Sequence, residues 1–386
     1  MALPPADLRG RSFDRILLIK LSAMGDVVQT MPVLNKLRAR FPEARLDWLT
    51  VPAMAELLRP NPKITNVVTF AREEWRQPWR PRPYVSAVRL AARLRAVRYD
   101  LVLDLQGQLR SGLIARATGA PVRIGFGPPQ PELWDSAARK LPPEARKHAW
   151  QGAREGAWRA YTHYIALPVR DMHAVDRYLG VGPMLGLGEG PPDFSFSLPA
   201  AADARVDTLL RRHGRGNDAL IVMAPGANWE TKRWNAEKFA AVARHFLERG
   251  AAVALVGTGT ERADCAGVAA LAPGAVNLAG ETSLTGLAAL IRRARLCITN
   301  DSGPMHLAVA LGIPVVSVFG PTDEIWAGPY RQPEAVVRAA LACAPCYLRR
   351  LSRCPNAHAC MHDVPADTVI ARAEGMLRQP ALAAVT

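Results

Sequence analysis

Residues 15–30 read RILLIKLSAMGDVVQT, and this stretch decides the first element of the fold. The apolar run at its start is typical of a buried strand, and the residues after it predict a helix that extends to about Arg40. Gly25 and the carboxylate Asp26 stand where the strand should end. Ligands of open α/β sheets bind at the carboxyl ends of the strands, so Asp26 either belongs to such a site or only stabilises the first turn of its helix.

The alternation of strand and helix continues through the first half of the chain. ARLDWLTV at 44–51, ITNVVTF at 64–70 and YDLVLDLQG at 99–107 are predicted strands, and SAVRLAARLRAVR at 86–98 has helical spacing. Apolar strands that alternate with helices predict parallel βαβ units. Residues 149–165, AWQGAREGAWRAYTHYI, are predicted to be helical.

A second series of strands and helices follows a Gly- and Pro-rich stretch, GVGPMLGLGEGPPDF at 180–194. We therefore expect an N-terminal domain at 1–185, a linker region at 186–215 and a C-terminal domain at 216–386. The predicted fold class is α/β, with two Rossmann-like doubly wound domains that face each other across a cleft.

In the second half, CITNDSGPMHL at 297–307 places polar residues between a buried strand and a helix. Pro304 occupies the position where proline is favoured at a helix start. The first amides of that helix have no internal partner, so Ser302 and Gly303 would let a phosphate approach. Asp301 could accept hydrogen bonds from a sugar hydroxyl. The alternative is an ordinary cap between a strand and a helix.

Two further strand-end loops carry weaker signals. Lys232, in APGANWETKRW at 224–234, could be a point-charge partner of a phosphate, or a solvated lysine. Gly257, in LVGTGTERA at 255–263, fits a nucleotide pocket but also any tight turn.

The net charge of +15 and the isoelectric point of about 10.1 favour nucleic acid, an anionic membrane surface or phosphorylated ligands as partners. A base-composition bias of the genome would give the same charge. The chain contains no motif of a nucleic-acid-binding protein, so we expect no nucleic acid partner. AREEWRQPWRPRPY at 71–84 interleaves Trp and Arg, which suits an anionic saccharide or lipid headgroups, although a solvated loop would look the same. With neither a run of about 18 apolar residues nor a signal peptide, we expect a cytoplasmic protein.

Four of the six cysteines cluster near the C-terminus, at Cys343, Cys346, Cys354 and Cys360. In a reducing cytoplasm they would be free thiols or metal ligands. Their spacing is not that of a standard zinc finger, so the sequence leaves metal binding open and we assign no metal ligand.

Several stretches occur in the order seen in the lipopolysaccharide heptosyltransferases, family 9 of the glycosyltransferases, which the chain resembles over nearly its whole length. They are ILLIKLSAMGDVVQTMPVL, YDLVLDLQGQLRSGLIA, HAVDRYL, APGANWETKRWNAEKFAAVA, NLAGETSLTGLAALIRRARLCITNDSGPMHLAVALGIPVVSVFGPT and the Cys-rich tail. The resemblance implies the GT-B arrangement, with an N-terminal acceptor domain and a C-terminal domain that binds the donor ADP-heptose. It also implies inverting transfer to the inner core of lipopolysaccharide, with no metal or other cofactor required. A glycolipid acceptor would make the enzyme peripheral to the anionic inner face of the inner membrane.

The resemblance assigns Asp26 as the general base. It implies a donor site at Asn228, Thr231, Lys232, Gly257, Asp301, Ser302, Gly303 and His306. Candidate acceptor residues are Ser22, Gly25, Arg110 and Ser111. The loop before Lys232 is hydroxyl-rich in the family but reads Ala227-Asn228 here, which puts the contacts of Asn228 in doubt. His306 matches a histidine near the phosphates, and the alternative is a histidine satisfied within its helix.

Similar Cys-rich tails occur in the branch of the family that adds the second heptose, which favours that branch. The first-heptose transferase acting on Kdo-lipid A and another nucleotide-sugar transferase of the same fold are the alternatives. A dinucleotide-dependent oxidoreductase would need a Gly-x-Gly-x-x-Gly fingerprint after the first strand, and SAMGDVVQ lacks it.

Overall fold

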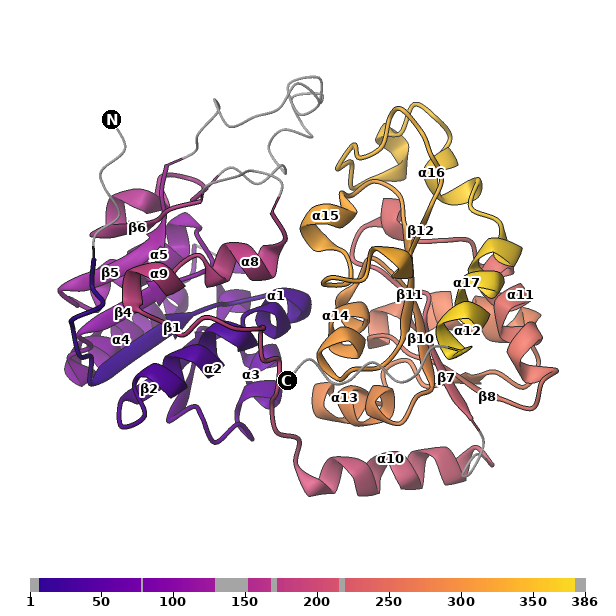
Figure 1. The fold of residues 1–386 in the computed structure, drawn as a ribbon, viewed down its shortest axis with the longest axis horizontal. Helices are drawn as coiled ribbons and strands as arrows, with labels where there is room; N and C mark the ends of the chain where they lie inside the picture. Colours follow the sequence, from indigo (N-terminus) through magenta and orange to yellow (C-terminus); the bar gives the residue numbers. More distant parts are fainter. Residues whose placement is uncertain (1–6, 78, 129–151, 168–171, 215–218, 379–386) are drawn as a thin grey trace. The chain divides into compact units, whose positions relative to one another are not determined.

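The protein divides into two compact units, which are described separately (Figure 1). The structure, a computed structural model, describes residues 7–77, 79–128, 152–167, 172–214 and 219–378. Among these, unit 1 comprises the residues up to Ser197, and unit 2 comprises the residues from Leu198.

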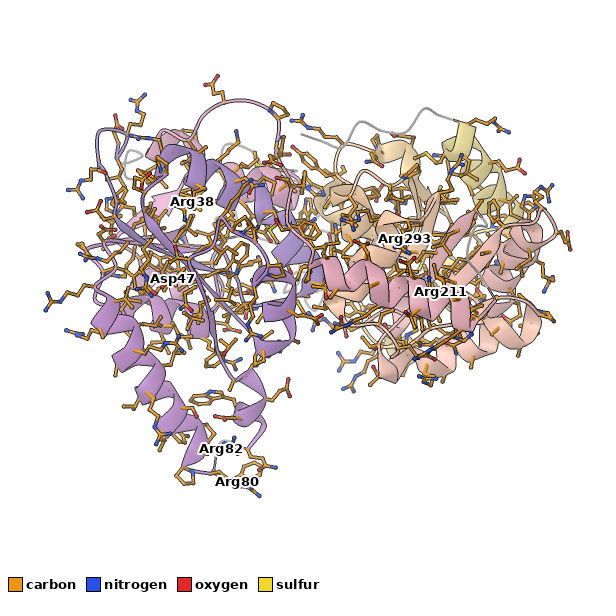
Figure 2. All side chains as sticks on the ribbon, turned by 90° about the horizontal axis from the view of Figure 1, so that it is seen from below. Arg38, Asp47, Arg80, Arg82, Arg211 and Arg293 are labelled. Carbon is orange, nitrogen blue, oxygen red and sulfur yellow. The ribbon has the colours of Figure 1, made fainter. Side chains whose placement is uncertain are left out.

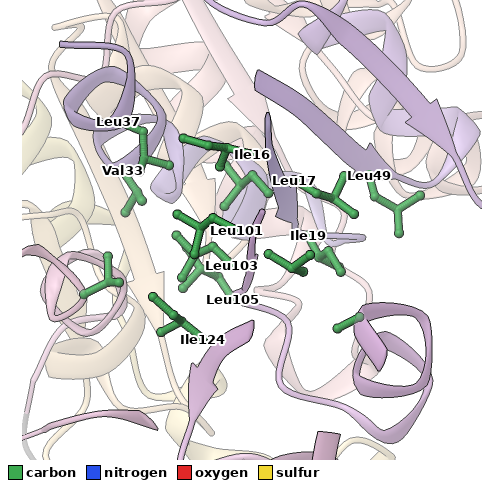
Figure 3. Close-up of a cluster of buried hydrophobic side chains, with 14 of the residues drawn as sticks. Ile16, Leu17, Ile19, Val33, Leu37, Leu49, Leu101, Leu103, Leu105 and Ile124 are labelled. Atoms are coloured by element: carbon green, nitrogen blue, oxygen red, sulfur yellow. The ribbon is translucent and has the colours of Figure 1, made fainter. Parts of the chain in front are cut away.

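Unit 1 is built on a six-stranded parallel sheet with the order β3-β2-β1-β4-β5-β6. The strands are β1 (Arg15–Ile19), β2 (Arg45–Thr50), β3 (Asn66–Thr69), β4 (Leu101–Asp104), β5 (Val122–Phe126) and β6 (His163–Ile165). The central strands β1 and β4 are buried almost throughout, as expected for a parallel sheet with both faces covered. Figure 3 shows their side chains, including Ile16, Leu17, Leu101 and Leu103, in the core of the unit.

The helices of unit 1 connect these strands, and the label η marks 3-10 helices. They are α1 (Met24–Gln29), α2 (Met31–Arg40), α3 (Pro52–Leu58), η1 (Arg72–Arg76), α4 (Arg82–Val97), α5 (Leu109–Ala117), η3 (Ala157–Ala160), α8 (Ala174–Leu179) and α9 (Gly182–Leu185).

Unit 2 repeats this design with the strand order β12-β11-β10-β7-β8-β9, again with parallel pairing. The strands are β7 (Leu220–Ala224), β8 (Ala252–Leu255), β9 (Val276–Asn277), β10 (Leu296–Asn300), β11 (Val315–Phe319) and β12 (Val336–Arg338). In chain order both sheets have the Rossmann arrangement, in which the order reverses between the first and fourth strands.

The helices of unit 2 lie before, between and after its strands. They are α10 (Ala200–Arg212), η4 (Glu230–Lys232), α11 (Ala236–Leu247), η5 (Gly259–Glu261), α12 (Arg262–Leu271), α13 (Leu284–Arg292), α14 (Gly303–Ala310), α15 (Glu324–Ala327), η6 (Pro333–Ala335), η7 (Leu351–Arg353), α16 (Ala359–His362) and α17 (Ala366–Arg378).

The expectation of two Rossmann-like α/β domains is confirmed, and one local prediction differs from the structure. Within 149–165, residues 149–151 lie outside the described residues, and the helix predicted for the rest is wrong because His163–Ile165 forms β6. The predicted linker region 186–215, which the structure describes up to residue 214, has residues in both units. Its first part bonds to unit 1, where the Asn35 amide donates to the Asp193 carbonyl at 2.7 Å, whereas α10 packs on α13 in unit 2.

Candidate active site

Asp26 lies in the first turn of α1, directly after the loop that leaves β1. The Tyr178 hydroxyl, from α8, donates to Asp26 Oδ1 at 2.6 Å. The Ala23 backbone amide donates to Asp26 Oδ2 at 3.1 Å. The Asp26 side chain keeps 40% of its surface exposed, so a substrate can reach a carboxylate that is already oriented.

The second contact of Asp26 Oδ1 is the ammonium of Lys20, a buried lysine at the end of β1, with Nζ at 3.2 Å. The same ammonium donates to the Leu105 carbonyl at 2.9 Å and to the Tyr178 hydroxyl at 2.7 Å. Tyr178 therefore accepts from Lys20 and donates to Asp26. This chain of hydrogen bonds occupies Oδ1, whereas Oδ2 accepts the Ala23 amide within the described part of the chain.

These contacts keep Asp26 ionised. Burial raises the pKa of the Asp26 carboxyl, but the Lys20 ammonium and the Tyr178 hydroxyl outweigh it, and the pKa is lowered overall. Burial lowers the pKa of Lys20, although the neighbouring Asp26 carboxylate acts to raise it. Burial also raises the pKa of Tyr178 well above its ordinary value, so the phenol keeps its proton and acts as a donor.

A second buried carboxylate, Asp104, ends β4 at the same edge of the sheet. Its Oδ1 accepts the Gln106 and Gly107 amides, and its Oδ2 accepts the Tyr161 hydroxyl at 2.7 Å. Burial raises the pKa of Asp104 despite these donors. Asp104 has no exposed surface, so its contacts hold the β4–α5 loop.

The four candidate acceptor residues lie at or beside this edge of unit 1. The Ser22 hydroxyl is 3.5 Å from an Arg72 guanidinium nitrogen, and Gly25 is buried in α1. Arg110 is exposed, with its guanidinium 5.7 Å from the centre of the Phe70 ring. Ser111 is fully buried and its hydroxyl donates to the Gln108 carbonyl at 2.9 Å, a geometry that supports a structural role at the start of α5.

In unit 2, Lys232 and Asp301 meet although they come from different loops. Lys232 Nζ lies 2.5 Å from Asp301 Oδ2, and the Thr322 hydroxyl donates to the same oxygen at 2.6 Å. The Lys232 ammonium also lies 4.5 Å from the centre of the Trp229 ring. A cation and a carboxylate that face each other at the carboxyl edge can separate to bind a phosphate and a sugar hydroxyl, respectively.

The helix predicted to receive a phosphate is α14, and Ser302 is its N-cap. Gly303 begins the helix, and Pro304 takes its first turn as predicted. The Ser302 hydroxyl is buried and has no hydrogen-bond partner within the described part of the chain. His306 is buried in the second turn of α14.

The remaining candidate donor residues differ in accessibility. Asn228 is exposed, and Gly257 is half-buried after β8. Thr231 is buried, and its hydroxyl donates to the Leu348 carbonyl at 2.5 Å, while the Nε2 atom of His358 lies 2.7 Å from the Thr231 carbonyl. Thr231 therefore attaches the loop of Lys232 to the C-terminal tail.

The Cys-rich tail supports this loop through backbone and histidine contacts. Cys343 is exposed, Cys346 and Cys354 are half-buried, and burial together with the neighbouring cysteines raises the pKa of the Cys360 thiol to about 12. Within the described ranges, no three His, Cys, Asp or Glu side chains are grouped so that they could hold a metal ion.

Several residues that complete these arrangements were missed from the sequence: Lys20, Tyr178, Asp104, Tyr161, Trp229, Thr322 and His358. Lys20 could have been found, because a lysine that ends an otherwise apolar strand needs a partner when it is buried. Thr322 stands in the recognised stretch VVSVFGPT. Tyr178 stands in the recognised stretch HAVDRYL, but nothing in that stretch indicates its contact with Asp26, which lies 152 residues away in the chain.

Two Rossmann-like sheets with charged side chains gathered at their carboxyl edges place the chain among the two-domain α/β enzymes. The family model of glycosyltransferase family 9 (heptosyltransferase) matches residues 87–133 and 129–357. The chain belongs to this family and is a glycosyltransferase.

Individual relatives agree with this membership. The chain is 30% identical to lipopolysaccharide heptosyltransferase 1 of Pseudomonas aeruginosa over 335 residues, which cover 86% of each chain. The structure of a family 9 glycosyl transferase from Veillonella parvula superposes with a TM-score of 0.73 at 22% identity, covering 97% of this chain and 99% of that one. The ADP-heptose LPS heptosyltransferase II of Escherichia coli superposes with a TM-score of 0.71 at 21% identity, covering 94% and 98%. At such identities the two structures show the shared fold alone.

Proposed function

We propose that this enzyme transfers heptose from ADP-heptose to the inner core of lipopolysaccharide with inversion, and that Asp26 is the general base. The observation that carries the proposal is the partly exposed carboxylate of Asp26 in the first turn of α1, ionised and held by Tyr178 and Lys20, in a chain of the heptosyltransferase family.

The contacts of Asp26 fit proton transfer from an acceptor hydroxyl. Oδ1 is engaged by Tyr178 and Lys20, so we assign the proton transfer to Oδ2, whose hydrogen-bond donor in the described part of the chain is the Ala23 amide. As the acceptor oxygen bonds to the anomeric carbon from the side opposite the leaving group, its proton passes to Asp26. The bond between the anomeric carbon and the diphosphate oxygen breaks, and ADP leaves with the electron pair.

The donor site is proposed in unit 2. The developing charge on ADP needs a cation and oriented donors, and Lys232 with the first amides of α14 can supply them. Asp301, released from Lys232, would accept hydrogen bonds from a hydroxyl of the ribose. Of the other donor candidates, Ser302, Gly303, Asn228, Gly257 and His306 stay in the proposal, and Thr231 is proposed to act through its hold on the loop.

The acceptor determines where the enzyme works and which step it catalyses. A lipid-borne acceptor places the protein at the anionic cytoplasmic face of the inner membrane, as a peripheral partner. None of the helices in the described ranges has the length and apolar composition needed to cross a bilayer. The Cys-rich tail favours transfer of the second heptose, whereas the 30% identical relative is named heptosyltransferase 1. ADP release with a panel of truncated lipopolysaccharide acceptors separates the two steps.

The base is tested by Asp26→Asn, which removes the proton acceptor and keeps the shape of the side chain. We expect turnover to fall by roughly 10²–10⁴-fold, the usual contribution of general-base catalysis. The affinity for ADP should be unchanged, which verifies the fold. Asp193→Asn is the matched control, because Asp193 is also paired with a lysine, Lys63 at 3.4 Å. Turnover of Asp26→Asn within about threefold of wild type would exclude Asp26 as the base.

A further inference from the structure

Large apolar side chains are exposed at the beginning of α4 and α5 in unit 1. Trp79 is 76% exposed and Val88 is 68% exposed, and both lie at or near the start of α4. We call the whole set the apolar tip, and its members are Trp79, Tyr84, Val85, Val88, Leu109 and Leu113. A surface of this kind is uncommon on a protein that works alone in water and marks a site of interaction.

The members from α4 and α5 lie on neighbouring helices. Both helices follow strands of the same parallel sheet and run back along it, so they are parallel, and they pack on each other. Near their ends, a Cβ atom on Gly119 would lie 3.7 Å from the Arg95 guanidinium. Counting back the same number of residues along each helix, at about 1.5 Å per residue, brings Val85 level with Leu109.

The segment before α4 is folded onto the helix. The Arg82 guanidinium lies 3.0 Å from Glu74 Oε1, and the rings of Trp75 and Tyr84 meet edge to face with centroids 5.4 Å apart. Between η1 and α4 lies a cavity of about 370 Å³ lined by Glu73, Glu74, Gln77, Arg80, Arg82 and Pro83. The ion pair and the ring contact thus attach the segment before α4 to the start of the helix.

Basic side chains accompany the apolar tip. Arg80 and Arg89 are exposed among its residues, and Figure 2 shows Arg80 and Arg82 at the projecting end of α4. Aromatic side chains with arginines are typical of the boundary between lipid tails and headgroups, and anionic headgroups attract arginine. The net charge of +15 adds a long-range attraction of the same sign.

The apolar tip also lies at the edge of the sheet that carries Asp26. Helix α5 follows the carboxyl end of β4 after a short loop, and η1, which leads into α4, follows the carboxyl end of β3. The contact of Arg72 with Ser22 at 3.5 Å connects η1 to the loop before Asp26. A membrane that touches the apolar tip would thus face the edge from which Asp26 is reached.

We propose that the apolar tip docks unit 1 on an anionic lipid bilayer, with Trp79, Val85 and Val88 in the interface and Arg80 and Arg89 on the headgroups. The inference rests on the proposed function, since docking serves an acceptor that stays in the membrane. It makes the contact partly hydrophobic, in addition to the general attraction of a basic protein.

The test is co-sedimentation of the full chain with vesicles of phosphatidylethanolamine and phosphatidylglycerol, with phosphatidylcholine vesicles in parallel. Val85→Gln/Val88→Gln should weaken binding to the anionic vesicles roughly tenfold. The reason is that the variant lacks the apolar surface of two valine side chains that would be partly buried in the bilayer. Glutamine is a better helix former than valine, so α4 should persist. Ile325→Gln, which alters an exposed apolar residue of unit 2, is the matched control and should bind like wild type.

The contribution of the arginines is tested separately with Arg80→Gln/Arg89→Gln. Each arginine near an anionic surface should contribute about fivefold to binding, so the double variant should bind anionic vesicles roughly 25-fold more weakly. Arg211→Gln/Arg212→Gln, on exposed residues of α10, is the control for net charge. Equal losses in both arginine pairs would mean that net charge alone binds the membrane and would overturn the proposal. Unchanged vesicle binding of the valine variant would also overturn the proposal. This includes the outcome in which the valine substitutions convert a dimer into a monomer without weakening vesicle binding.

Activity separates this inference from the proposed function. The valine variant should release ADP at the wild-type rate with a deacylated acceptor and more slowly with the acceptor embedded in vesicles. If wild type transfers heptose to neither acceptor, the proposed function fails, while the vesicle measurements still decide the docking. If the valine variant is slowed equally with both acceptors, the apolar tip acts on catalysis and the docking proposal is wrong.

Discussion

Asp26 differs from an ordinary helix-capping aspartate in the side chains that hold it. A capping carboxylate needs only the backbone, and the Ala23 amide supplies that contact. Tyr178 adds a neutral donor and Lys20 a charged one, both from other parts of unit 1. Both contacts favour the ionised carboxylate, and both are made to Oδ1. Because Oδ1 is fixed, the orientation of Oδ2 is also determined.

The pH dependence of turnover should therefore respond to Tyr178. The base must be ionised, so the rate falls as the pH drops through the pKa of Asp26, which is lowered in wild type. Tyr178→Phe removes a hydrogen bond that favours the ionised form, so the pKa of Asp26 rises and the acidic limb of the kcat profile moves to higher pH. Arg154 and Arg177 also act on this group of residues and stay in place. Tyr164→Phe, whose hydroxyl donates to the Trp158 carbonyl, should leave the profile unchanged. An unshifted limb in Tyr178→Phe would contradict a role for this tyrosine in tuning Asp26.

Among the residues of unit 2, we expect substitution of Lys232 to have the clearest effect on ADP binding. Lys232→Ala should weaken ADP binding by roughly 1.5–3 kcal/mol, the range for hydrogen bonds to charged groups. Isothermal titration measures it, and Lys36→Ala in unit 1 is the control. An ADP affinity equal to that of wild type, in a folded variant, would remove Lys232 from the donor site.

At the scale of elements, the sequence predicted the parts of the fold that depend on local pattern. The apolar strands β1, β2, β4 and β10 were found because a parallel sheet buries both faces of its central strands. The edge strand β6 was missed because its three residues, His163–Ile165, have no strand pattern of their own. Their conformation comes from pairing with β5, a tertiary contact.

The same distinction applies to the candidate site. Asp26 and Asp301 were predicted because a carboxylate that follows a buried strand lies at the carboxyl edge of the sheet. Their partners could not be predicted in the same way. Tyr178 reaches Asp26 because α8 packs on α1, and Thr231 is held by a tail that begins more than a hundred residues later. Contacts of this kind depend on tertiary packing, which a single sequence does not show.

The β5–η3 contact allows a test at this scale. A Cβ atom on Gly125 would lie 2.4–2.6 Å from the Tyr161 ring, whose hydroxyl bonds to Asp104. Gly125→Ala should therefore displace Tyr161 and destabilise unit 1 by about 1–3 kcal/mol, the usual cost of overpacking. Gly375→Ala is the opposite case, because it lies within α17 with no atom within 4 Å of the added Cβ. It should stabilise the protein by about 0.5–1 kcal/mol. Thermal unfolding of both variants checks the signs, and a neutral Gly125→Ala would mean that Tyr161 can move without loss.

At the scale of the whole molecule, the two units carry different parts of the proposed reaction. The proposed base and its supports come from β1, α1 and α8 in unit 1. The proposed donor contacts come from η4, the loop after β10 and α14 in unit 2. The two Rossmann-like units would thus hold two proposed sites with different chemistry at equivalent carboxyl edges.

This division predicts where ADP alone should protect the protein from amide hydrogen exchange. Because every proposed ADP contact lies in unit 2, protection should be largest in the segments 226–234 and 299–306. The segment 20–27, around Asp26, should change little, since ADP lacks the heptose that would approach the base. At an ADP concentration of about 100 times Kd, binding stabilises the native state by about 2.7 kcal/mol, enough to slow exchange clearly in the segments that it holds. Lys232→Ala, measured at the same ADP concentration, should lose much of the protection in both segments of unit 2. Protection of 20–27 equal to or greater than that of 299–306 would mean that unit 1 contributes directly to nucleotide binding, and the assignment of the donor to unit 2 alone would be wrong.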